Sequence, residues 1–408
     1  MQPTWTLGAL VQSKATPAAL QQTTQRLLQE TTADGVLYWD ARLGMPDEST
    51  IARLIELPGH MWHAGLCLGM AGLPRLMHYT RPTWMFNVDP PHHVDATSWR
   101  VSLRACLVRT DVLRHLGGIA TACTSLAGAS LDLGLRALTA GLLPRHIPWM
   151  LPQPPAQGAP ETLPVEDEFA IARSHYPSWQ VFWAGMRGAA KGALSLSQAV
   201  RHTLARSTAQ IPSVKWFPPP PDSQLTLEDL RATQPRITIL IPTIDRYSYL
   251  RVLLDQCRGQ TLTPHEILVI DQTEAEQRDH QLAQDFADLP LRVITMDEAG
   301  QCRSRNLGLQ VSTGDYIMFL DDDDEIPPNL LETHLRNLLL LRADVSSGVV
   351  YEPPQQPREV QKNRIRASDV FPTNITLLRR KSSERAACSI SHSTAAPAKI
   401  TIWVCASI

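Results

Sequence analysis

One stretch, residues 314–325, constrains what this chain can fold into more than any other part of it. It reads Gly-Asp-Tyr-Ile-Met-Phe-Leu-Asp-Asp-Asp-Asp-Glu. The apolar run 316–320 follows a turn signal and predicts a buried strand of a mostly parallel sheet. Four aspartates end this run, and such crowded carboxylates repel one another unless a cation neutralises them, for which Mg²⁺ or Mn²⁺ has the right preference for hard oxygen ligands. We therefore expect a metal-binding sheet edge here, with a solvated acidic turn as the alternative.

The composition of the chain excludes several classes of protein. Its 408 residues carry a net charge of −2, which speaks against nucleic acid or an anionic membrane as the main partner. The seven cysteines are scattered without a Cys-x-x-Cys pair, so neither a disulfide framework nor a zinc site is predicted. We see no leader of basic and then apolar residues and no run of transmembrane length. These features predict a cytoplasmic, globular protein of two or three domains.

Residues 236–385 predict an α/β domain. Apolar, β-branched strands alternate there with helices, and this alternation specifies a doubly wound, mostly parallel, Rossmann-like sheet. The expected strands are 237–241, 266–270, 291–296 and 316–320, and the expected helices are 249–259, 274–287 and 303–311.

The remaining segments are less regular. We expect a first domain over 1–150, a helical segment with proline-rich linkers over 151–235, and an irregular, disordered tail over 386–408. Within the first two we expect a weak helix over 1–32, strands at 35–39 and 99–108, and helices at 112–116, 131–143 and, in pieces, 166–206. One helical face in the last of these has the spacing of a buried face and consists of Trp179, Phe182, Trp183 and Met186.

Three expected strands of 236–385 end in polar residues. These ends are Pro-Thr-Ile-Asp-Arg at 242–246, Asp-Gln-Thr at 271–273, and the aspartate run. Because parallel strands point the same way, the three sets converge on one sheet edge, where open α/β sheets bind ligands. Residues 300–306 open a helix beside them, and a helix N-terminus with nearby arginines favours an anion such as diphosphate. Together these features predict a nucleotide site.

With these motifs the sequence resembles a known family. Residues 236–385 resemble family 2 glycosyltransferases, the inverting type with the nucleotide-sugar-binding A fold. The resemblance rests on Ile-Pro-Thr-x-x-Arg at 241–246, Asp271, Arg-x-Arg-Asn at 303–306 and Phe-Leu-Asp-Asp-Asp-Asp at 319–324.

The resemblance implies roles for individual residues. Asp321 and Asp323 would form the Asp-x-Asp pair that binds Mg²⁺ or Mn²⁺ together with the diphosphate of the donor. The donor would be a nucleotide sugar, with a UDP-sugar as our expectation, and the acceptor a glycan, lipid or polysaccharide precursor. Peripheral membrane association is a further implication. The implied donor-binding residues are Pro242, Thr243, Asp245, Arg246, Asp271, Arg303, Arg305, Asn306, Asp321 and Asp322.

The resemblance also implies a general base, an acidic residue beyond the strand expected at 374–380. After Arg380 the only acidic residue is Glu384, and no amphipathic period is evident. Codons can be chosen for 386–408 that, read in a shifted frame, encode Arg-Lys-Asp-His-Asp-Leu-Gly-Met-Arg, whose Asp-His-Asp cluster would supply the base. We therefore expect a frameshift near residue 383 and no catalytic base in this chain, with a natural disordered tail as the alternative.

A degenerate copy of the same domain is expected near the N-terminus. Residues 33–46 align with 314–327 without a gap, which matches Asp40 to Asp321 and Arg42 to Asp323. Further on, Leu-Val-Arg at 107–109 matches Leu-Leu-Arg at 377–379, and 132–136 matches Asp-Leu-Gly-Met-Arg of the shifted frame. With an arginine in place of a metal ligand and no counterpart of the strand at 237–241, this half domain is predicted not to bind a nucleotide sugar.

The sequence thus predicts a metal-dependent glycosyltransferase whose transfer step is impaired. The alternative is a non-catalytic nucleotide-sugar-binding or scaffold protein that uses the same fold. A nucleotidyltransferase would share the acidic strand ends, but the glycine-rich basic loop typical of that class does not follow residue 241.

Overall fold

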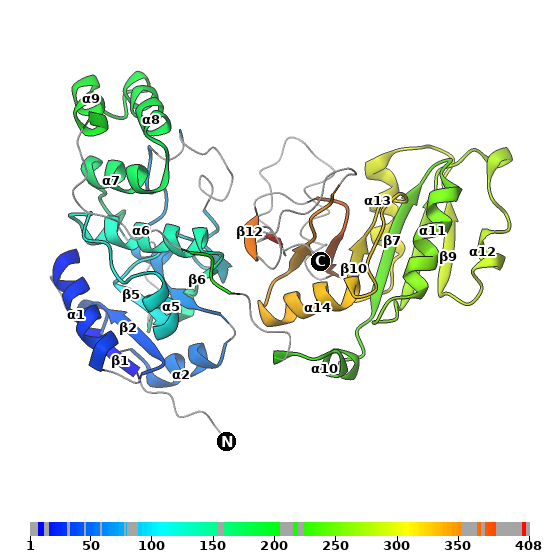
Figure 1. Ribbon diagram of the computed structural model, residues 1–408, viewed down its shortest axis with the longest axis horizontal. Helices are drawn as coiled ribbons and strands as arrows, with labels where there is room; N and C mark the ends of the chain where they lie inside the picture. Colours follow the sequence, from blue (N-terminus) through cyan, green and yellow to red (C-terminus); the bar gives the residue numbers. More distant parts are fainter. Residues whose placement is uncertain are drawn as a thin grey trace. The chain divides into compact units, whose positions relative to one another are not determined.

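The computed structural model divides into two compact units, residues 1–217 and 218–408, which meet inside the expected proline-rich linker (Figure 1). Among the described residues, no helix combines the length and apolar character needed to cross a bilayer. The described residues are 7–11, 16–30, 33–44, 46–57, 59–76, 79, 89–152, 159–204, 215–218, 224–351, 365–368, 372–380 and 402–404.

Unit 1 is built on a six-stranded mixed sheet with the order β1-β2-β5-β3-β6-β4. The strands are β1 Leu7–Val11, β2 Gly35–Trp39, β3 Met61–His63, β4 Ala96–Thr97, β5 Ala105–Arg109 and β6 Pro144–His146. The α-helices are α1 Pro17–Glu30, α2 Glu48–Glu56, α5 Thr110–His115, α6 Leu126–Thr139, α7 Val165–His175, α8 Ser178–Ala190 and α9 Leu196–Leu204, and the 3₁₀ turns are η1 Ala41–Leu43, η2 Gly65–Leu68 and η3 Pro148–Met150.

Unit 2 contains an eight-stranded sheet with the order β12-β14-β11-β13-β10-β7-β8-β9. The strands are β7 Ile237–Thr243, β8 Glu266–Asp271, β9 Leu291–Thr295, β10 Tyr316–Phe319, β11 Val345–Ser347, β12 Arg366–Ser368, β13 Thr376–Arg379 and β14 Ile402–Val404. The helices are α10 Leu227–Ala232, α11 Tyr247–Arg258, η5 Ala275–Gln277, α12 Leu282–Asp285, α13 Gln301–Val311 and α14 Leu330–Leu340.

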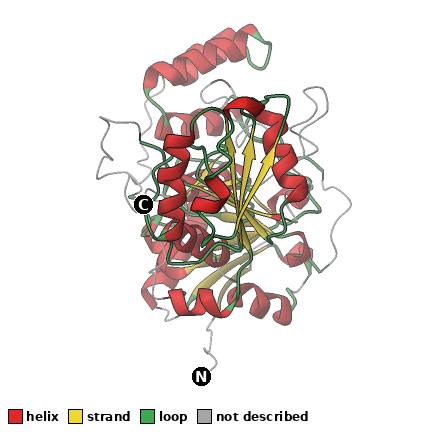
Figure 2. Ribbon diagram, turned by 90° about the vertical axis from the view of Figure 1, so that its right-hand side faces the viewer, coloured by secondary structure: helices red, strands yellow, loops and turns green. Residues whose placement is uncertain are grey.

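The sheet of unit 2 has the doubly wound arrangement expected from the sequence. Strands β10, β7, β8 and β9 are parallel neighbours, and helices lie on both sides of the strands (Figure 2). The strands β10, β7 and β8 are mostly buried and apolar, as expected when both faces of a strand are covered, whereas β9 is only partly buried. Leu240, Leu268 and Ile317 are fully buried in one core cluster. The predicted α/β class and mostly parallel sheet are therefore confirmed for this unit.

The two sheets share one strand plan. The order β1-β2-β5-β3-β6-β4 has the same sequence of parallel and antiparallel pairings as β7-β10-β13-β11-β14-β12. The register agrees as well, since Gly35 pairs with Arg109 in unit 1 and Tyr316 pairs with Arg379 in unit 2. In the sheet of unit 2, two further strands, β8 and β9, follow beyond β7. Among the described residues, the sheet of unit 1 has no strand beyond β1.

The structure corrects our expectation that unit 1 lacks a counterpart of the strand at 237–241. Strand β1 pairs in parallel with β2 as β7 pairs with β10. Its sequence, Leu-Gly-Ala-Leu-Val, has only one β-branched residue and therefore a weak strand signal. For this reason the sequence predicts a weak helix over 1–32 and no strand. The Pro-Thr-x-x-Arg motif at 242–246, which begins within β7, has no equivalent in the sequence after β1.

Other elements also differ from the sequence-based predictions. The strand predicted at 99–108 is confined to β5, and the helix predicted at 274–287 is reduced to η5 and α12 because the backbone is extended at Arg278. Part of the predicted disordered tail, Ile402–Val404, forms β14, while 381–401 and 405–408 lie outside the described residues. The prediction of a buried aromatic face on α8 is wrong, because Trp179, Phe182 and Trp183 are exposed.

A glycine in α6 provides a test of the packing in unit 1. A Cβ on Gly134 would lie 2.1 Å from the carbonyl oxygen of Trp99. We predict that Gly134→Ala lowers the free energy of unfolding by about 2 kcal/mol, because overpacking outweighs the better helix propensity of alanine. Urea unfolding followed by tryptophan fluorescence measures this. Gly35→Ala is the matched control, because its Cβ would be 3.4 Å from the nearest atom. Equal midpoints for the two variants would contradict the prediction.

Candidate functional site

A cavity of about 420 Å³ opens in unit 2 at the carboxyl ends of β7, β8 and β10, beside the start of α13. The topology brings the three polar strand ends to one edge, as expected for parallel neighbours. Its lining residues are Pro242, Thr243, Ile244, Arg246, Gln272, Ala299, Gly300, Gln301, Arg305, Asp321, Asp322 and Asp323.

The aspartate run meets a cation or a hydroxyl group at each of its first three residues. Arg305 Nη2 donates to Asp321 Oδ1, and Thr243 Oγ1 donates to Asp322 Oδ2 at 2.7 Å. Arg246 Nη1 donates to Asp323 Oδ2 at 2.8 Å. Thus the strand end of β7 and helix α13 both contribute groups that hold the carboxylates in place.

These contacts do not fully offset the cost of crowding the carboxylates. Burial raises the pKa of Asp321, Asp322 and Asp324, and the neighbouring aspartates raise each pKa further. The pKa of Asp324 reaches about 6, although its Oδ2 accepts the N–H of Asp321 at 2.8 Å. A raised carboxyl pKa means that the negative charge is under-compensated, and added positive charge would stabilise the run.

The residues present fit a divalent cation that is shared with a ligand. Among the described residues, no group of three or more His, Cys, Asp or Glu side chains could hold a metal ion alone. Asp321 and Asp323 nevertheless line the same cavity, and Mg²⁺ commonly takes one or two carboxylates, several waters and substrate phosphates. In addition, the Nε atom of Arg305 is buried and has no hydrogen-bond partner among the residues that the structure describes, so this donor can serve a ligand.

The residues implied to hold the nucleoside differ in burial. Asp271, at the end of β8, is buried and accepts hydrogen bonds from Tyr247 Oη at 2.7 Å and from the N–H of Thr273 at 3.0 Å. Asp245 is exposed, has a φ of 56°, and donates its N–H to Thr273 Oγ1 at 3.0 Å. Neither side chain is among those that line the cavity, whereas Pro242 is.

Helix α13 presents only some of its implied residues to the cavity. Arg303 is exposed and paired with Glu298. The Oδ1 atom of Asn306 is buried and has no hydrogen-bond partner within the described part of the chain. Neither residue lines the cavity. Sequence reasoning did not assign Gln272, whose Oε1 accepts the N–H of Gly300 at 2.7 Å and joins the start of α13 to β8. Gln272 directly follows Asp271, the last residue of β8, and this position could have indicated that its side chain lies at the same sheet edge.

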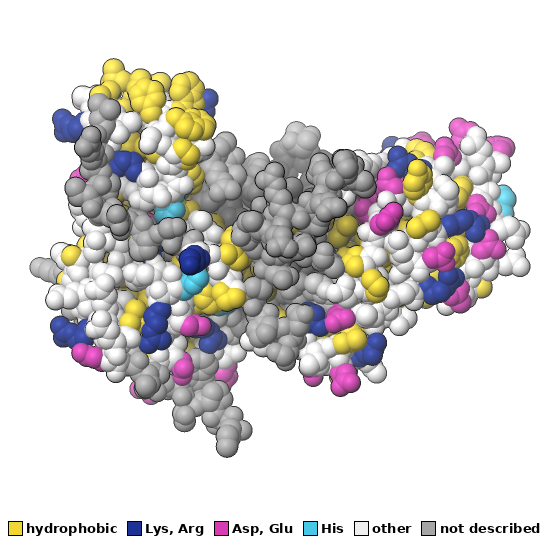
Figure 3. All heavy atoms as spheres, viewed as in Figure 1, with side chains coloured by type: hydrophobic (Ala, Val, Ile, Leu, Met, Phe, Trp, Pro, Cys, Tyr) yellow, Lys and Arg dark blue, Asp and Glu magenta, His cyan; other side chains and the backbone are white. Residues whose placement is uncertain are grey.

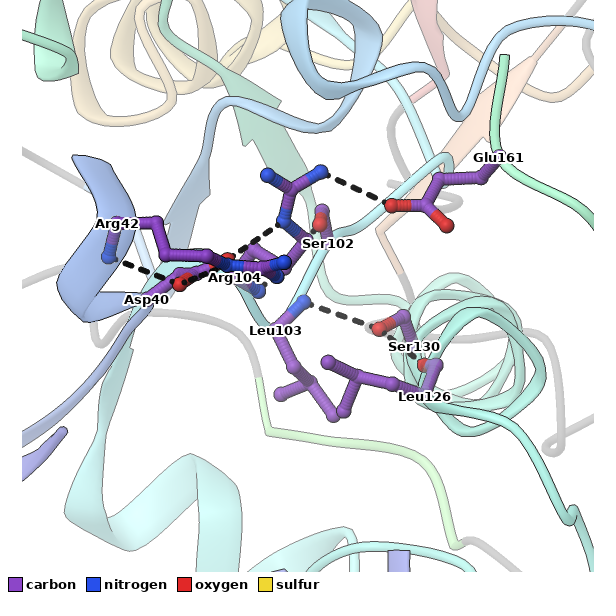
Figure 4. Close-up of polar contacts among 8 residues, drawn as sticks. All are labelled: Asp40, Arg42, Ser102, Leu103, Arg104, Leu126, Ser130 and Glu161. Carbon is purple, nitrogen blue, oxygen red and sulfur yellow. Dashed lines mark hydrogen bonds and ion pairs between the residues drawn. The ribbon is translucent and has the colours of Figure 1, made fainter. Parts of the chain in front are cut away.

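The equivalent place in unit 1 is filled by arginine (Figure 4). Asp40 follows β2 as Asp321 follows β10, and it is buried. Arg42 donates to both of its carboxylate oxygens, with Nη2 at 2.7 Å from Oδ2, and Arg104 Nε lies 3.0 Å from Oδ2. Arg104 Nη1 in turn contacts Glu161 at 2.9 Å. Two guanidinium groups therefore supply the positive charge here.

Helix α6 of unit 1 carries the segment that matches the Asp-His-Asp cluster of the shifted frame. The match places Ser130 at the first aspartate and Asp132 at the second. Ser130 Oγ accepts the N–H of Leu103 at 3.0 Å and donates to the carbonyl oxygen of Leu126 at 2.7 Å (Figure 4). Asp132 is fully buried in an ion pair within the helix. Both side chains are engaged in packing α6, so neither is placed as a base.

The arginine clamp on Asp40 predicts a specific pH dependence. Burial raises the pKa of Asp40, but the bonds from Arg42 and Arg104 outweigh this and hold the pKa at about 2, below its ordinary 3.8. Because the folded pKa is depressed, the stabilisation is complete above the unfolded value and is lost as the pH falls from about 4 to 2.

We predict that Asp40→Asn lowers the free energy of unfolding by up to about 2 kcal/mol near neutral pH, and that this difference shrinks toward zero at pH of about 2. Urea unfolding of both proteins across this range measures it. A difference that stays constant with pH would show that the charge of Asp40 is not the stabilising feature.

Comparison with known proteins gives consistent matches. Residues 238–396 match the family described as glycosyl transferase family 2. Glycosyltransferase GlyA of Streptococcus pneumoniae is 29% identical over 118 residues, which cover 28% of this chain and 17% of GlyA. The uncharacterized glycosyltransferase YwdF of Bacillus subtilis is 34% identical over 98 residues, 24% of this chain and 36% of YwdF. An uncharacterized glycosyltransferase of Haemophilus influenzae is 26% identical over 145 residues, 32% and 47% of the two chains.

Solved structures of low similarity also match. Pyrobaculum calidifontis mannosyltransferase PcManGT in complex with GDP-Man and Mn²⁺ is 20% identical, with a TM-score of 0.31, and the match covers 37% of this chain and 46% of that one. S. aureus TarS in complex with UDP-GlcNAc is 20% identical, with a TM-score of 0.30, covering 36% and 47%. This chain spans less than half the length of these curated relatives. The family match covers the residues that carry the motifs along the sheet edge, so this part of the chain is similar to the family 2 glycosyltransferases.

Proposed function

We propose that the chain is a glycosyltransferase whose donor, a nucleotide sugar, binds in the cavity of unit 2. The observation that carries this proposal is the convergence of Asp321 and Asp323 with Arg246 and Arg305 on one cavity at the carboxyl edge of a parallel sheet. An activated donor carries a diphosphate, and a site that mixes carboxylates with arginines suits a diphosphate that arrives with a divalent cation.

Each of these residues has a proposed role toward the donor. Asp321 and Asp323 would hold Mg²⁺ or Mn²⁺, which supplies Lewis acidity to the diphosphate leaving group. Arg246 and Arg305 now pair with those same carboxylates, so they are positioned to turn to the phosphate oxygens when the carboxylates are engaged. Asp322 stays tied to Thr243 and fixes the loop after β10 against β7.

The nucleoside end of the donor is assigned to β8. Asp271 is held rigidly by Tyr247 and Thr273, and a carboxylate fixed in this way can accept hydrogen bonds from a base or a ribose. We propose a UDP-sugar as donor and a glycan, lipid or polysaccharide precursor as acceptor, with inversion at the anomeric carbon. We further propose that the chain works in the cytoplasm at the inner face of a membrane.

We propose that transfer by this sequence is slow. Deprotonation of the acceptor hydroxyl requires a base within hydrogen-bond reach. The carboxylates that line the cavity are those of the aspartate run, which serve the donor, and the segment after Arg380 contains a single acidic residue, Glu384. That glutamate lies outside the described residues.

Unit 1 is proposed to be a degenerate copy that does not bind a donor. Its sheet repeats the strand plan of unit 2 without β8 and β9 among the described residues, so it lacks the edge on which Asp271 stands. The guanidinium groups of Arg42 and Arg104 already occupy both oxygens of Asp40. A metal would have to displace an internal cation there.

Nucleotide titration tests the site and the number of sites together. In the presence of Mn²⁺ we predict that the full chain binds one UDP, and that Asp323→Ala weakens binding at least about tenfold through loss of a metal ligand. Isothermal titration calorimetry gives both the affinity and the stoichiometry.

The control is Asp297→Ala, which removes a carboxylate that is 98% exposed and outside the cavity lining. Its affinity is expected to equal that of the unchanged chain. Equal weakening in both variants would remove the special role of Asp323, and a stoichiometry of two would refute the degenerate-copy proposal.

A further inference from the structure

Helix α8 is apolar on two opposite faces, which is unusual for a helix on the outside of a unit. One face consists of small or short side chains and is buried, and the other is aromatic and exposed. The buried residues are Val181, Ala184, Gly185 and Gly188, and the exposed ones are Trp179, Phe182 and Trp183.

The small face of α8 is committed to the interior of unit 1. A Cβ on Gly185 would lie 3.3 Å from the ring of Phe169 in α7, and a Cβ on Gly188 would lie 2.7 Å from Leu76 and 2.8 Å from Leu194. Helix α8 also packs against α9 on this side. The glycines permit this close approach, and a rotation that turned the aromatic face inward would bring large rings against Phe169, Leu76 and Leu194.

The aromatic face continues onto α9. Trp179, Phe182 and Trp183 are 67%, 48% and 51% exposed, and Leu196 and Val200 of α9 are 58% and 42% exposed. These five residues are called the α8–α9 face below. Figure 3 shows apolar side chains gathered at the end of unit 1 that α8 and α9 form. A contiguous exposed apolar surface of this kind marks an interaction site more often than scattered apolar residues do.

The segment that forms this face carries charges of one sign. No aspartate or glutamate occurs between Glu168 and Asp222, although the whole chain has a net charge of −2. Helices α8 and α9 and the turn between them carry Arg187, Lys191 and Arg201. The guanidinium group of Arg187 lies 5.5 Å from the ring of Trp183, so a cation sits directly beside the aromatic surface.

We propose that the α8–α9 face docks this chain on the surface of an anionic lipid bilayer. Tryptophan, phenylalanine and leucine on one side, flanked by cations and free of carboxylates, are the composition of a helix that lies in the membrane interface. A face for a protein partner would gain specificity from mixed charges, which this segment lacks. The proposal supplies a surface for the membrane location proposed above, and it depends neither on donor binding nor on transfer.

Vesicle co-sedimentation of the full chain, without nucleotide or metal, tests the proposal. We expect binding to vesicles of equal parts phosphatidylglycerol and phosphatidylcholine, and weaker binding to phosphatidylcholine alone. The double variant Trp179→Gln with Trp183→Gln is expected to lower the partition coefficient at least about tenfold, because two rings no longer enter the interface. Both residues are exposed, so the fold of unit 1 should persist, and circular dichroism verifies this.

The matched control is Tyr249→Gln with Val252→Gln, which changes two exposed apolar residues of α11 in unit 2, 59% and 51% exposed. It is expected to leave the partition coefficient unchanged. A second arm, Lys191→Glu with Arg201→Glu, should lower binding to the anionic vesicles at least about fivefold and leave binding to phosphatidylcholine nearly unaltered.

Three results would overturn the proposal. The first is no binding to either kind of vesicle, and the second is equal loss in the tryptophan variant and the α11 control. The third is self-association of the chain without lipid, by analytical ultracentrifugation, that the tryptophan variant abolishes, which would make the face a protein interface. Since UDP titration is a separate measurement, failure here leaves the donor-site proposal standing, and the reverse also holds.

Discussion

The crowding of four carboxylates at the end of a buried strand is the constraint on which the site in unit 2 depends. Strand β10 places Asp321 and its neighbours where burial penalises their charge, and the pKa of Asp324 rises to about 6 as a result. Neighbouring elements place cations and a hydroxyl group against this charge. Arg246 after β7, Arg305 in α13 and Thr243 at the end of β7 each contact one aspartate. Thr243, Arg246 and Arg305 thus line one cavity together with the aspartates that they contact.

Unit 1 also has a carboxylate buried at the end of a strand, and side chains of the same unit neutralise it. Its strand β2 also delivers a buried aspartate, Asp40, at the sheet edge, but the clamp of Arg42 and Arg104 keeps its pKa at about 2. The two units thus share a strand plan and a register while their electrostatics are opposite. In unit 2 the pKa of Asp321, Asp322 and Asp324 is raised, whereas in unit 1 the pKa of Asp40 is lowered. Arg42, at the position that aligns with Asp323, supplies one of the two cations that contact Asp40, and Arg104 supplies the other.

Features of the fold and the site were predictable where they follow from short stretches of sequence, and not where they depend on contacts between distant segments. The strands at β7, β8 and β10 were predicted from unbroken apolar runs, and the meeting of their ends followed from parallel topology. The role of Gln272 and the pairing of Tyr247 with Asp271 were not predicted, because each depends on contacts between segments distant in sequence. Strand β1 was missed for a related reason, since Leu-Gly-Ala-Leu-Val has little strand propensity of its own and becomes a strand by pairing with β2.

The sequence by itself determined the α/β class, the sheet edge that carries the candidate site, and the identity of its acidic and basic residues. These are consequences of periodicity and of residue type, which act over a few neighbouring residues. Only the tertiary structure decided which side of α8 is buried. Both of its faces have helical apolar spacing, and the glycine face is the one that lies against Phe169 and Leu194, where the neighbouring side chains approach closely. Periodicity shows that a face is apolar, but the space available in the packed core determines whether that face is buried.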